Sequence, residues 1–170
     1  MDRLEAIDNT VYYGFTLKTT ERAVMQIVHG TDVYDTIVLN EDTKPGVVEG
    51  LSYNEKYYFE IYIGEDEGPE FNESVYVLAP FTFSYSLEGK TLSYEIKKQN
   101  WTGNYHTAKI LFIAMSGQDP IDFNLLNPDI WVDDTISGTE ELQVGMYYIQ
   151  GDVNAYYFDL GEITVTDQGP

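Results

Sequence analysis

A stretch of fifteen residues in the first half of the chain has side chains that alternate with a period of two. In "GLSYNEKYYFEIYIG", residues 50–64, the first set from Tyr57 onward is apolar: Tyr57, Phe59, Ile61 and Ile63. The second set is Tyr58, Glu60 and Tyr62. Successive side chains of a β-strand point to opposite faces, whereas those of a helix repeat about every 3.6 residues. The stretch therefore predicts a strand with one buried face and one outward face.

Short segments of similar composition recur along the chain. They are rich in β-branched or aromatic residues and bounded by Gly, Asn, Asp or Pro: "TVYYGFTLK" (10–18), "RAVMQIVHG" (22–30), "YDTIVLN" (34–40) and "ESVYVLA" (73–79). Helical candidates are few, and "DFNLLNPDIW" is expected to hold one turn that Pro128 limits. Short strands at regular spacing, without crossover helices, predict an all-β fold of antiparallel sandwiches.

The chain is expected to divide near Pro80. Proline cannot donate a hydrogen bond to a strand ladder, so Pro80 in "YVLAPFTFS" suits a strand end or a domain junction. Segments on either side resemble one another in pairs: "AVMQIVHG" (23–30) and "ILFIAMSG" (110–117), "TVYYGFTLK" and "TLSYEIKK" (91–98), "ESVYVLAP" (73–80) and "GEITVTDQ" (161–168). These pairs predict two tandem β-sandwiches, residues 1–79 and 80–170.

In the first half Leu51 is followed six residues later by Tyr57, and Phe59 then continues the alternation. With this spacing the first half resembles the fibronectin type III domain. In that family a leucine in the turn before a strand precedes a tyrosine whose hydroxyl reaches back to the backbone of the turn. The usual buried tryptophan is missing, so the resemblance implies that Tyr13 or Phe15 fills its volume.

In the second half Leu142 and Tyr148 repeat the six-residue spacing, but the strand then runs into Gly151 and Asp152. This half is therefore expected to be an immunoglobulin-like sandwich without a more specific subfamily. The sandwich architecture hosts many functions, so the resemblance implies a fold and no activity.

Residues for catalysis are scarce. The chain has no cysteine and two histidines, His29 and His106, and neither histidine stands in a triad or metal-binding spacing. A glycine-rich phosphate loop and an HExxH motif are both absent from the sequence. A pair of catalytic carboxylates cannot be singled out among 29 acids. We therefore expect the protein not to be an enzyme and to need no cofactor.

Calcium stays open as an alternative. Hard oxygen ligands are offered by Asp119 and Asp122 in "GQDPIDFN" and by Asp133 and Asp134 in "WVDD". None of these segments matches an EF-hand loop, so the expectation is that no metal binds.

Four aromatic residues are the candidates for binding. Trp101 and Trp131 lie among polar neighbours, where an exposed indole suits stacking on a sugar, although plugging one end of a core is the favoured interpretation. Tyr58 and Tyr62 point away from the buried face of their strand. They form either a contact for a partner or ordinary cross-strand packing.

Charge excludes several classes of partner. The formal net charge is −20, and both halves share it. Such a surface repels phosphate backbones and anionic membranes, so a nucleic-acid groove and membrane binding are not expected. No stretch approaches the roughly 20 apolar residues that cross a bilayer, and the acidic N-terminus is unlike a signal peptide.

The function expected first is a structural or adhesive one. Acidic, cysteine-free tandem sandwiches resemble accessory virion proteins of tailed bacteriophages, which implies synthesis in a host cytoplasm and docking on capsid or tail proteins. The alternatives are a carbohydrate-binding or adhesin module, at a bacterial surface or secreted, that contacts a cell-surface glycan, and an acidic inhibitor that mimics DNA. Self-association into a homo-oligomer stays open.

Overall fold

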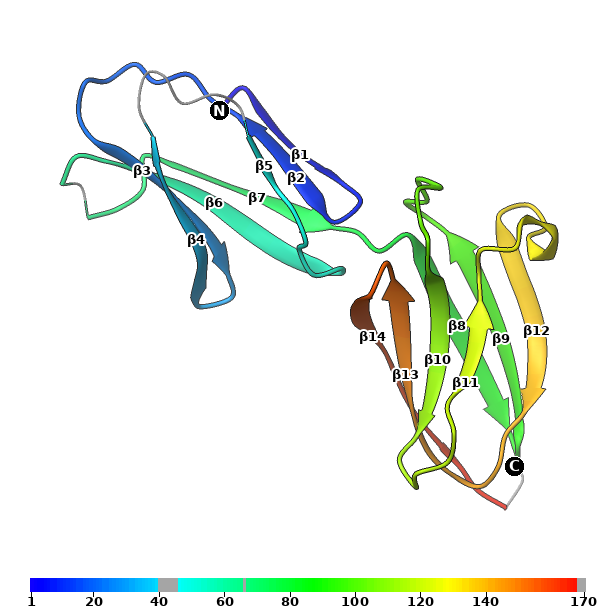
Figure 1. Ribbon diagram of the computed structural model, residues 1–170. Coiled ribbons are helices and arrows are strands. Elements are labelled where there is room, and N and C mark those ends of the chain that lie inside the picture. The colour runs from blue at the N-terminus through cyan, green and yellow to red at the C-terminus, as the bar shows by residue number, and fades with distance from the viewer. Residues whose placement is uncertain (40–45, 66, 168–170) are drawn as a thin grey trace. The chain divides into compact units, whose positions relative to one another are not determined.

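The computed structural model describes residues 1–39, 46–65 and 67–167. The chain divides into two compact units, Met1–Leu78 and Ala79–Pro170, which we call unit 1 and unit 2 (Figure 1). Within the described residues the regular elements are antiparallel strands and one short 3₁₀ turn, so the predicted all-β class is confirmed. None of the helical segments among these residues is long and apolar enough to cross a membrane.

Unit 1 consists of a three-stranded and a four-stranded sheet. Their strand orders are β1-β2-β5 and β4-β3-β6-β7. The strands are β1 (Arg3–Ile7), β2 (Thr10–Gly14), β3 (Ala23–His29), β4 (Asp32–Leu39), β5 (Gly46–Val48), β6 (Glu55–Ile63) and β7 (Phe71–Val77). The alternating stretch that opens the sequence forms β6, near the middle of the larger sheet.

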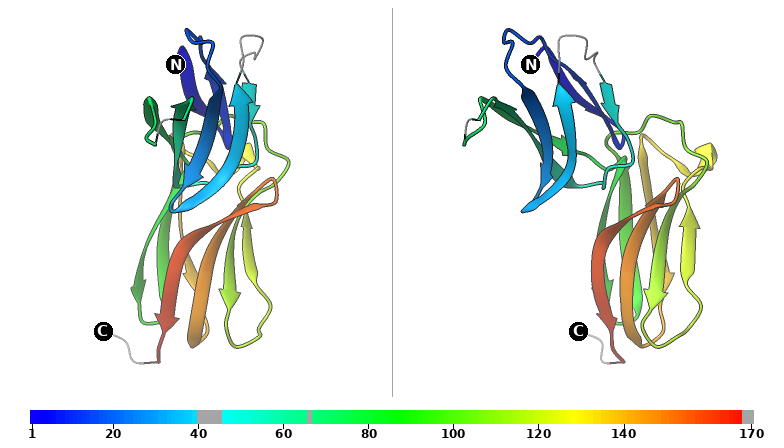
Figure 2. Two further views of the ribbon diagram at one scale, coloured as in Figure 1. Left: turned by 90° about the vertical axis from the view of Figure 1, so that its left-hand side faces the viewer. Right: turned by 60° about the vertical axis from the view of Figure 1, so that its left-hand side comes forward.

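Unit 2 repeats this plan, with strand orders β12-β9-β8 and β11-β10-β13-β14 (Figures 1 and 2). Its elements are β8 (Phe81–Glu88), β9 (Thr91–Lys98), β10 (Ala108–Ala114), β11 (Ile121–Asn124), η1 (Pro128–Ile130), β12 (Thr135–Glu141), β13 (Gly145–Val153) and β14 (Tyr156–Val165). The three segment pairs found in the sequence occupy equivalent places in the sheets: β3 with β10, β2 with β9, and β7 with β14. The predicted single turn is η1, which Pro128 begins rather than ends.

Alternation along the strands builds a core in each unit. In β6 the side chains of Tyr57, Phe59 and Ile61 are buried, and the residues between them are exposed or half-buried. In β10 the buried set is Ala108, Ile110, Phe112 and Ala114. Apolar area removed from water stabilises the fold by roughly 25 cal/mol per Å², so these faces hold the two sheets of each unit together.

Tyr57 closes one end of the unit 1 core, as the resemblance implied. Its side chain is 2% exposed, and its hydroxyl accepts a hydrogen bond from the backbone N–H of Ser52 at 3.0 Å. Leu51 lies fully buried in the same turn. The predicted tyrosine corner is therefore confirmed in this unit.

In unit 2 the tyrosine at the six-residue spacing, Tyr148, is not the buried one. Tyr147, at 3% exposure, is the buried tyrosine, and its hydroxyl donates to the backbone carbonyl of Gln143 at 3.2 Å. Tyr148 faces the opposite side of β13, where it is half-buried. The turn after Leu142 is one residue shorter than the turn after Leu51. A shift of one residue in a strand exchanges the two faces, so the six-residue spacing does not select the buried tyrosine.

Two tyrosines cover glycines on the neighbouring strand, one pair in each unit. Tyr13 is buried and pairs with Gly46, while Tyr94 pairs with Gly138. A Cβ atom on Gly46 would lie 2.7 Å from Cζ of Tyr13, and one on Gly138 would lie 2.9 Å from Cζ of Tyr94. The ring thus occupies the space that the glycine leaves. Tyr13 also stacks against half-buried Phe15, with ring centres 6.3 Å apart.

Candidate functional site

Tyr58 and Tyr62 lie on the outward side of the four-stranded sheet in unit 1. Cross-strand register extends this side over β4, β3, β6 and β7, because paired residues of neighbouring strands share a face. We call the following residues the outer face of unit 1: Val33, Thr36 and Val38 on β4; Val24, Gln26 and Val28 on β3; Lys56, Tyr58, Glu60 and Tyr62 on β6; and Asn72, Ser74 and Tyr76 on β7.

The outer face is organised in rows that run across the strands. One apolar row joins Val38, Val24 and Tyr62, and a second joins Val33, Val28 and Tyr58. A polar row between them contains Thr36, Gln26, Glu60 and Asn72. The bulge in β4 between Val33 and Asp35 brings Val33 into line with Val28 and so completes the second apolar row.

Large apolar side chains on this face are open to solvent. The exposed fractions are 52% for Val33, 53% for Val38, 47% for Tyr76 and 37% for Tyr58. Among the residues of the outer face, one base and one acid are charged, although the chain as a whole carries −20. An exposed face that is rich in apolar side chains and carries no net charge is typical of a surface that contacts another molecule.

The two charged residues are both engaged with the predicted tyrosines. The amino group of Lys56 lies 5.9 Å from the ring centre of Tyr58. The hydroxyl of Tyr62 donates to Oε2 of Glu60 at 2.8 Å, and this hydrogen bond to a carboxylate raises the pKa of Tyr62 above its usual value. Tyr62 is therefore held to the sheet, and Tyr58 presents its ring beside a cation.

The equivalent face of unit 2 has a different character. Registers of β10, β11, β13 and β14 place four acids there: Asp122, Asp152, Asp159 and Glu162. Lys109 lies among them, with Nζ 3.7 Å from Oδ2 of Asp122. Burial and the nearby charge of Asp159 raise the pKa of Tyr148 on this face. The two equivalent faces thus differ in charge: four acids and Lys109 give the face of unit 2 a net charge of −3, whereas Lys56 and Glu60 cancel on the face of unit 1. Exposed apolar side chains, such as Tyr157, occur on the face of unit 2 as well.

Trp101 and Trp131, predicted separately, come together in unit 2. Their ring centres are 5.4 Å apart with the planes tilted by 57°. Nζ of Lys98 lies 5.3 Å from the ring centre of Trp101 and 4.6 Å from that of Trp131. Tyr105 meets Trp101 edge-on at 4.8 Å. Sequence reasoning missed Lys98 and Tyr105, whose places in this cluster depend on how two loops fold back.

This cluster lacks the form that stacking on a sugar requires. Both indoles are half-buried rather than exposed, and their tilt leaves no common plane. Nε1 of Trp131 already donates to the backbone carbonyl of Leu125 at 3.0 Å. Cation–π contacts of this kind stabilise folded structure, so the geometry favours the structural interpretation, in which the indoles close one end of the core.

The four calcium candidates lie in three different surroundings in unit 2. Asp133 and Asp134 are the two central residues of a tight turn, with φ of 50° and 62°. Such positive φ values suit the type I′ turn of a hairpin, where Asp is tolerated. Asp134 lies 3.9 Å from Nζ of Lys98. Asp122 faces Lys109, and Asp119 lines a separate polar hollow with Glu141.

Within residues 1–39, 46–65 and 67–167, no three His, Asp or Glu side chains gather into a set that could hold a metal ion. The two histidines lie in different units. Nε2 of His29 is 3.1 Å from Oε2 of Glu55, and its ring stacks on Tyr57 at 4.9 Å. The backbone N–H of His106 donates to Asn154. The side chain of His29 thus contacts Glu55 and Tyr57, and the backbone of His106 is hydrogen-bonded to Asn154.

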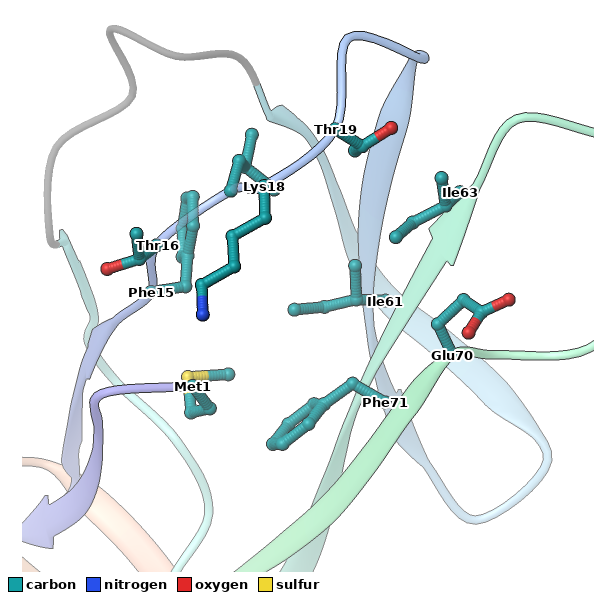
Figure 3. A pocket seen from close by; sticks show the side chains of 10 residues that line it. Met1, Phe15, Thr16, Lys18, Thr19, Ile61, Ile63, Glu70 and Phe71 are labelled. Atoms are coloured by element: carbon teal, nitrogen blue, oxygen red, sulfur yellow. The ribbon is translucent and has the colours of Figure 1, made fainter.

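Unit 1 also contains an apolar pocket of about 260 Å³ (Figure 3). It is lined by Met1, Phe15, Thr16, Leu17, Lys18, Thr19, Ile61, Ile63, Glu70 and Phe71. The sequence predicted one strand over residues 10–18, but β2 ends at Gly14. The segment after Gly14 leaves the ladder, and its half-buried Phe15 and Leu17 line the pocket.

Comparisons with known proteins assign this chain to no family. No protein-family model matches the sequence, and no curated protein matches it. A two-fibronectin-type-III-domain segment of chicken tenascin is 10% identical, with a TM-score of 0.37, over 96% of this chain and 98% of that one. The chicken CNTN1 FN1–FN3 domains are 9% identical, with a TM-score of 0.33, over 96% of this chain and 62% of that one. The fold assignment rests on the sheet order within each unit.

Proposed function

We propose that this chain is a non-enzymatic structural or adhesive module that binds another protein through the outer face of unit 1. The observation that carries the proposal is the set of exposed valines and tyrosines on a face without net charge, in a chain whose net charge is −20. Monomeric proteins rarely keep large apolar patches in water unless the patches bind something.

The chemistry of the face defines the partner that suits it. Its apolar rows favour a flat, apolar patch on the partner, and the Tyr58 and Tyr76 rings offer large contact area at low entropic cost. Acids elsewhere on the chain favour a basic rim around that patch, because opposite potentials speed association and disfavour wrong partners. The proposed partner is a protein surface with an apolar centre and a basic border.

The finer form of the proposal is an accessory virion component. In that setting the outer face of unit 1 docks on a capsid or tail protein, and unit 2, with its acidic outer face, remains in solvent and keeps particles dispersed. Many copies on one particle add avidity to contacts that are individually weak.

The test is binding by matched variants of the full chain. Capsid and tail proteins purified from phage particles would be passed over immobilised wild type, Tyr58→Ala/Tyr76→Ala and Tyr157→Ala. Tyr157 is 58% exposed on the equivalent face of unit 2 and serves as the control. We expect the double variant to weaken binding at least about tenfold, since truncated aromatic anchors cost roughly 2 kcal/mol or more, and the control to bind normally.

If wild type, the double variant and the Tyr157→Ala control all bind the virion proteins equally, the proposed role of the outer face is refuted. Wild type that ignores virion proteins but binds glycans on an array, with loss in Trp101→Ala, would favour the carbohydrate-binding alternative. Thermal melts of each variant would show that the sandwiches remain folded.

A further inference from the structure

The pocket in unit 1 lies at a different place from the outer face, between the two sheets at the end of the sandwich where β2 has left its ladder. Figure 3 shows the side chains of Met1, Ile61 and Phe71 directed into a common space that Phe15 borders. Ile61 forms part of the buried face of β6, so the pocket is an opening into the core.

The mouth of the pocket carries a free positive charge. Figure 3 shows the amino group of Lys18 at the edge of the space, while the carboxylate of Glu70 is turned away from it. Among the described residues no acid lies within ion-pair distance of Lys18, although Lys90, Lys97, Lys98 and Lys109 each have an acidic partner. Lys56 and Arg22 likewise have no ion pair among the described residues, but of these three bases Lys18 is the one that lines the pocket.

We propose that this pocket binds the apolar end of a small carboxylate, with Lys18 as the counter-charge at its mouth. The volume of about 260 Å³ exceeds the roughly 150 Å³ of a cavity that binds benzene, and lies just below the usual range for drug-sized ligands. One aromatic ring or one short alkyl chain therefore fits. The polar head then remains in water beside the ammonium group.

The sign of the ligand's charge is decided by local rather than overall charge. Exposed charges more than about 8 Å apart are largely screened at physiological ionic strength. Most of the acids that make the chain −20 are distant and therefore act weakly at the mouth. Two acids lie near it: the carboxylate of Glu70 is turned away from the space (Figure 3), and that of Asp2 accepts a hydrogen bond from the hydroxyl of Thr16. Lys18 is therefore the charged group that faces the ligand. A carboxylate is favoured over an alcohol of the same length, and an amine is disfavoured.

The experiment is an NMR titration of the uniformly ¹⁵N-labelled full chain with octanoate, 1-octanol and octylamine, which share one alkyl body. We expect octanoate to shift the amides of residues 15–19, 61–63 and 70–71 with a millimolar dissociation constant. Octanol should bind the same residues more weakly, and octylamine more weakly still. Shifts spread evenly over both units, or an affinity for octylamine equal to that for octanoate, would overturn the proposal.

Lys18→Gln separates charge from shape, because it removes the ammonium group and keeps most of the stem. It should lower the affinity for octanoate about two- to fivefold, the range of an exposed ion pair, and leave octanol unchanged. Lys56→Gln, on the outer face, is the matched control and should change neither. Filling the pocket with Leu17→Trp should abolish binding of all three probes, while well-dispersed spectra show that each variant is folded. Unchanged octanoate binding in both Lys18→Gln and Leu17→Trp would place the site elsewhere.

Discussion

Replacing Gly138 with alanine should destabilise unit 2 selectively. The new Cβ would lie 2.6 Å from Oη and 2.9 Å from Cζ of Tyr94, both closer than real Cβ atoms approach. The ring cannot retreat freely, because it is packed against Phe83 at 6.4 Å and Phe123 at 5.4 Å. The side chain of Tyr94 is half-buried, and burial raises its pKa above the usual value.

The magnitude follows from two opposing effects. Forcing an extra methyl group into a packed site costs about 1–3 kcal/mol, whereas glycine to alanine stabilises by about 0.4–1 kcal/mol through the unfolded state. The net loss should be about 1–2 kcal/mol. For a unit of 60–100 residues each kcal/mol lowers Tm by about 4–8 °C, so the expected fall is about 4–16 °C.

Tryptophan fluorescence suits this assay because Trp101 and Trp131, the two tryptophans of the chain, both lie in unit 2. Thermal unfolding followed this way should show the fall for Gly138→Ala and little change for Ser137→Ala, whose exposed side chain points away from the ring. In a Tyr94→Leu background the glycine change should become nearly neutral, since the clashing ring is gone. A fall of the same size in that background would refute the proposed contact.

Three further predictions concern single side chains. Tyr57→Phe removes the acceptor for the Ser52 N–H and should cost about 0.5–1.5 kcal/mol in urea unfolding, without a change in the m-value; an unchanged midpoint would contradict the tyrosine corner. Lys98→Met keeps the packing but loses two cation–π contacts, so it should cost about 1–2 kcal/mol and shift the tryptophan emission; an unaltered spectrum would contradict the cluster. Glu60→Gln should lower the pKa of Tyr62 in an ultraviolet titration, because the carboxylate raises that pKa by stabilising the protonated hydroxyl. This stabilisation of the fold is present below the ordinary tyrosine pKa and is lost as pH rises through the raised value. A pKa of Tyr62 that stays raised in the variant would exclude Glu60 as the cause.

Local patterns predicted the parts of the fold that depend on one strand at a time. The alternation in β6 identified its buried face and the tyrosine corner at Tyr57, because period two is a property of the strand itself. The six-residue spacing from a leucine does not identify the buried tyrosine of unit 2, because the length of the preceding turn decides which residue faces inward. The number of residues in this turn cannot be inferred from the alternation within the strand, and the buried tyrosine is Tyr147.

Contacts between segments distant in sequence were beyond prediction. Sequence analysis singled out Tyr58 and Tyr62 but missed Val33 and Val38, which join them only through the register of four strands. It likewise treated Trp101 and Trp131 as separate candidates. Their meeting around Lys98 depends on the paths of two loops, and composition carries no information on those paths.

The tyrosine–glycine pairs also constrain the order in which substitutions at the two positions can be accepted during evolution. A glycine beneath its ring cannot gain a side chain first, because every larger residue meets the ring. The tyrosine can shrink first, at the cost of exposing bare backbone, and the glycine is then free to vary. Tyr13 with Gly46 and Tyr94 with Gly138 repeat the arrangement in both units. Each pair therefore permits one mutational path and blocks its reverse, so a homologue without the glycine should already lack the tyrosine.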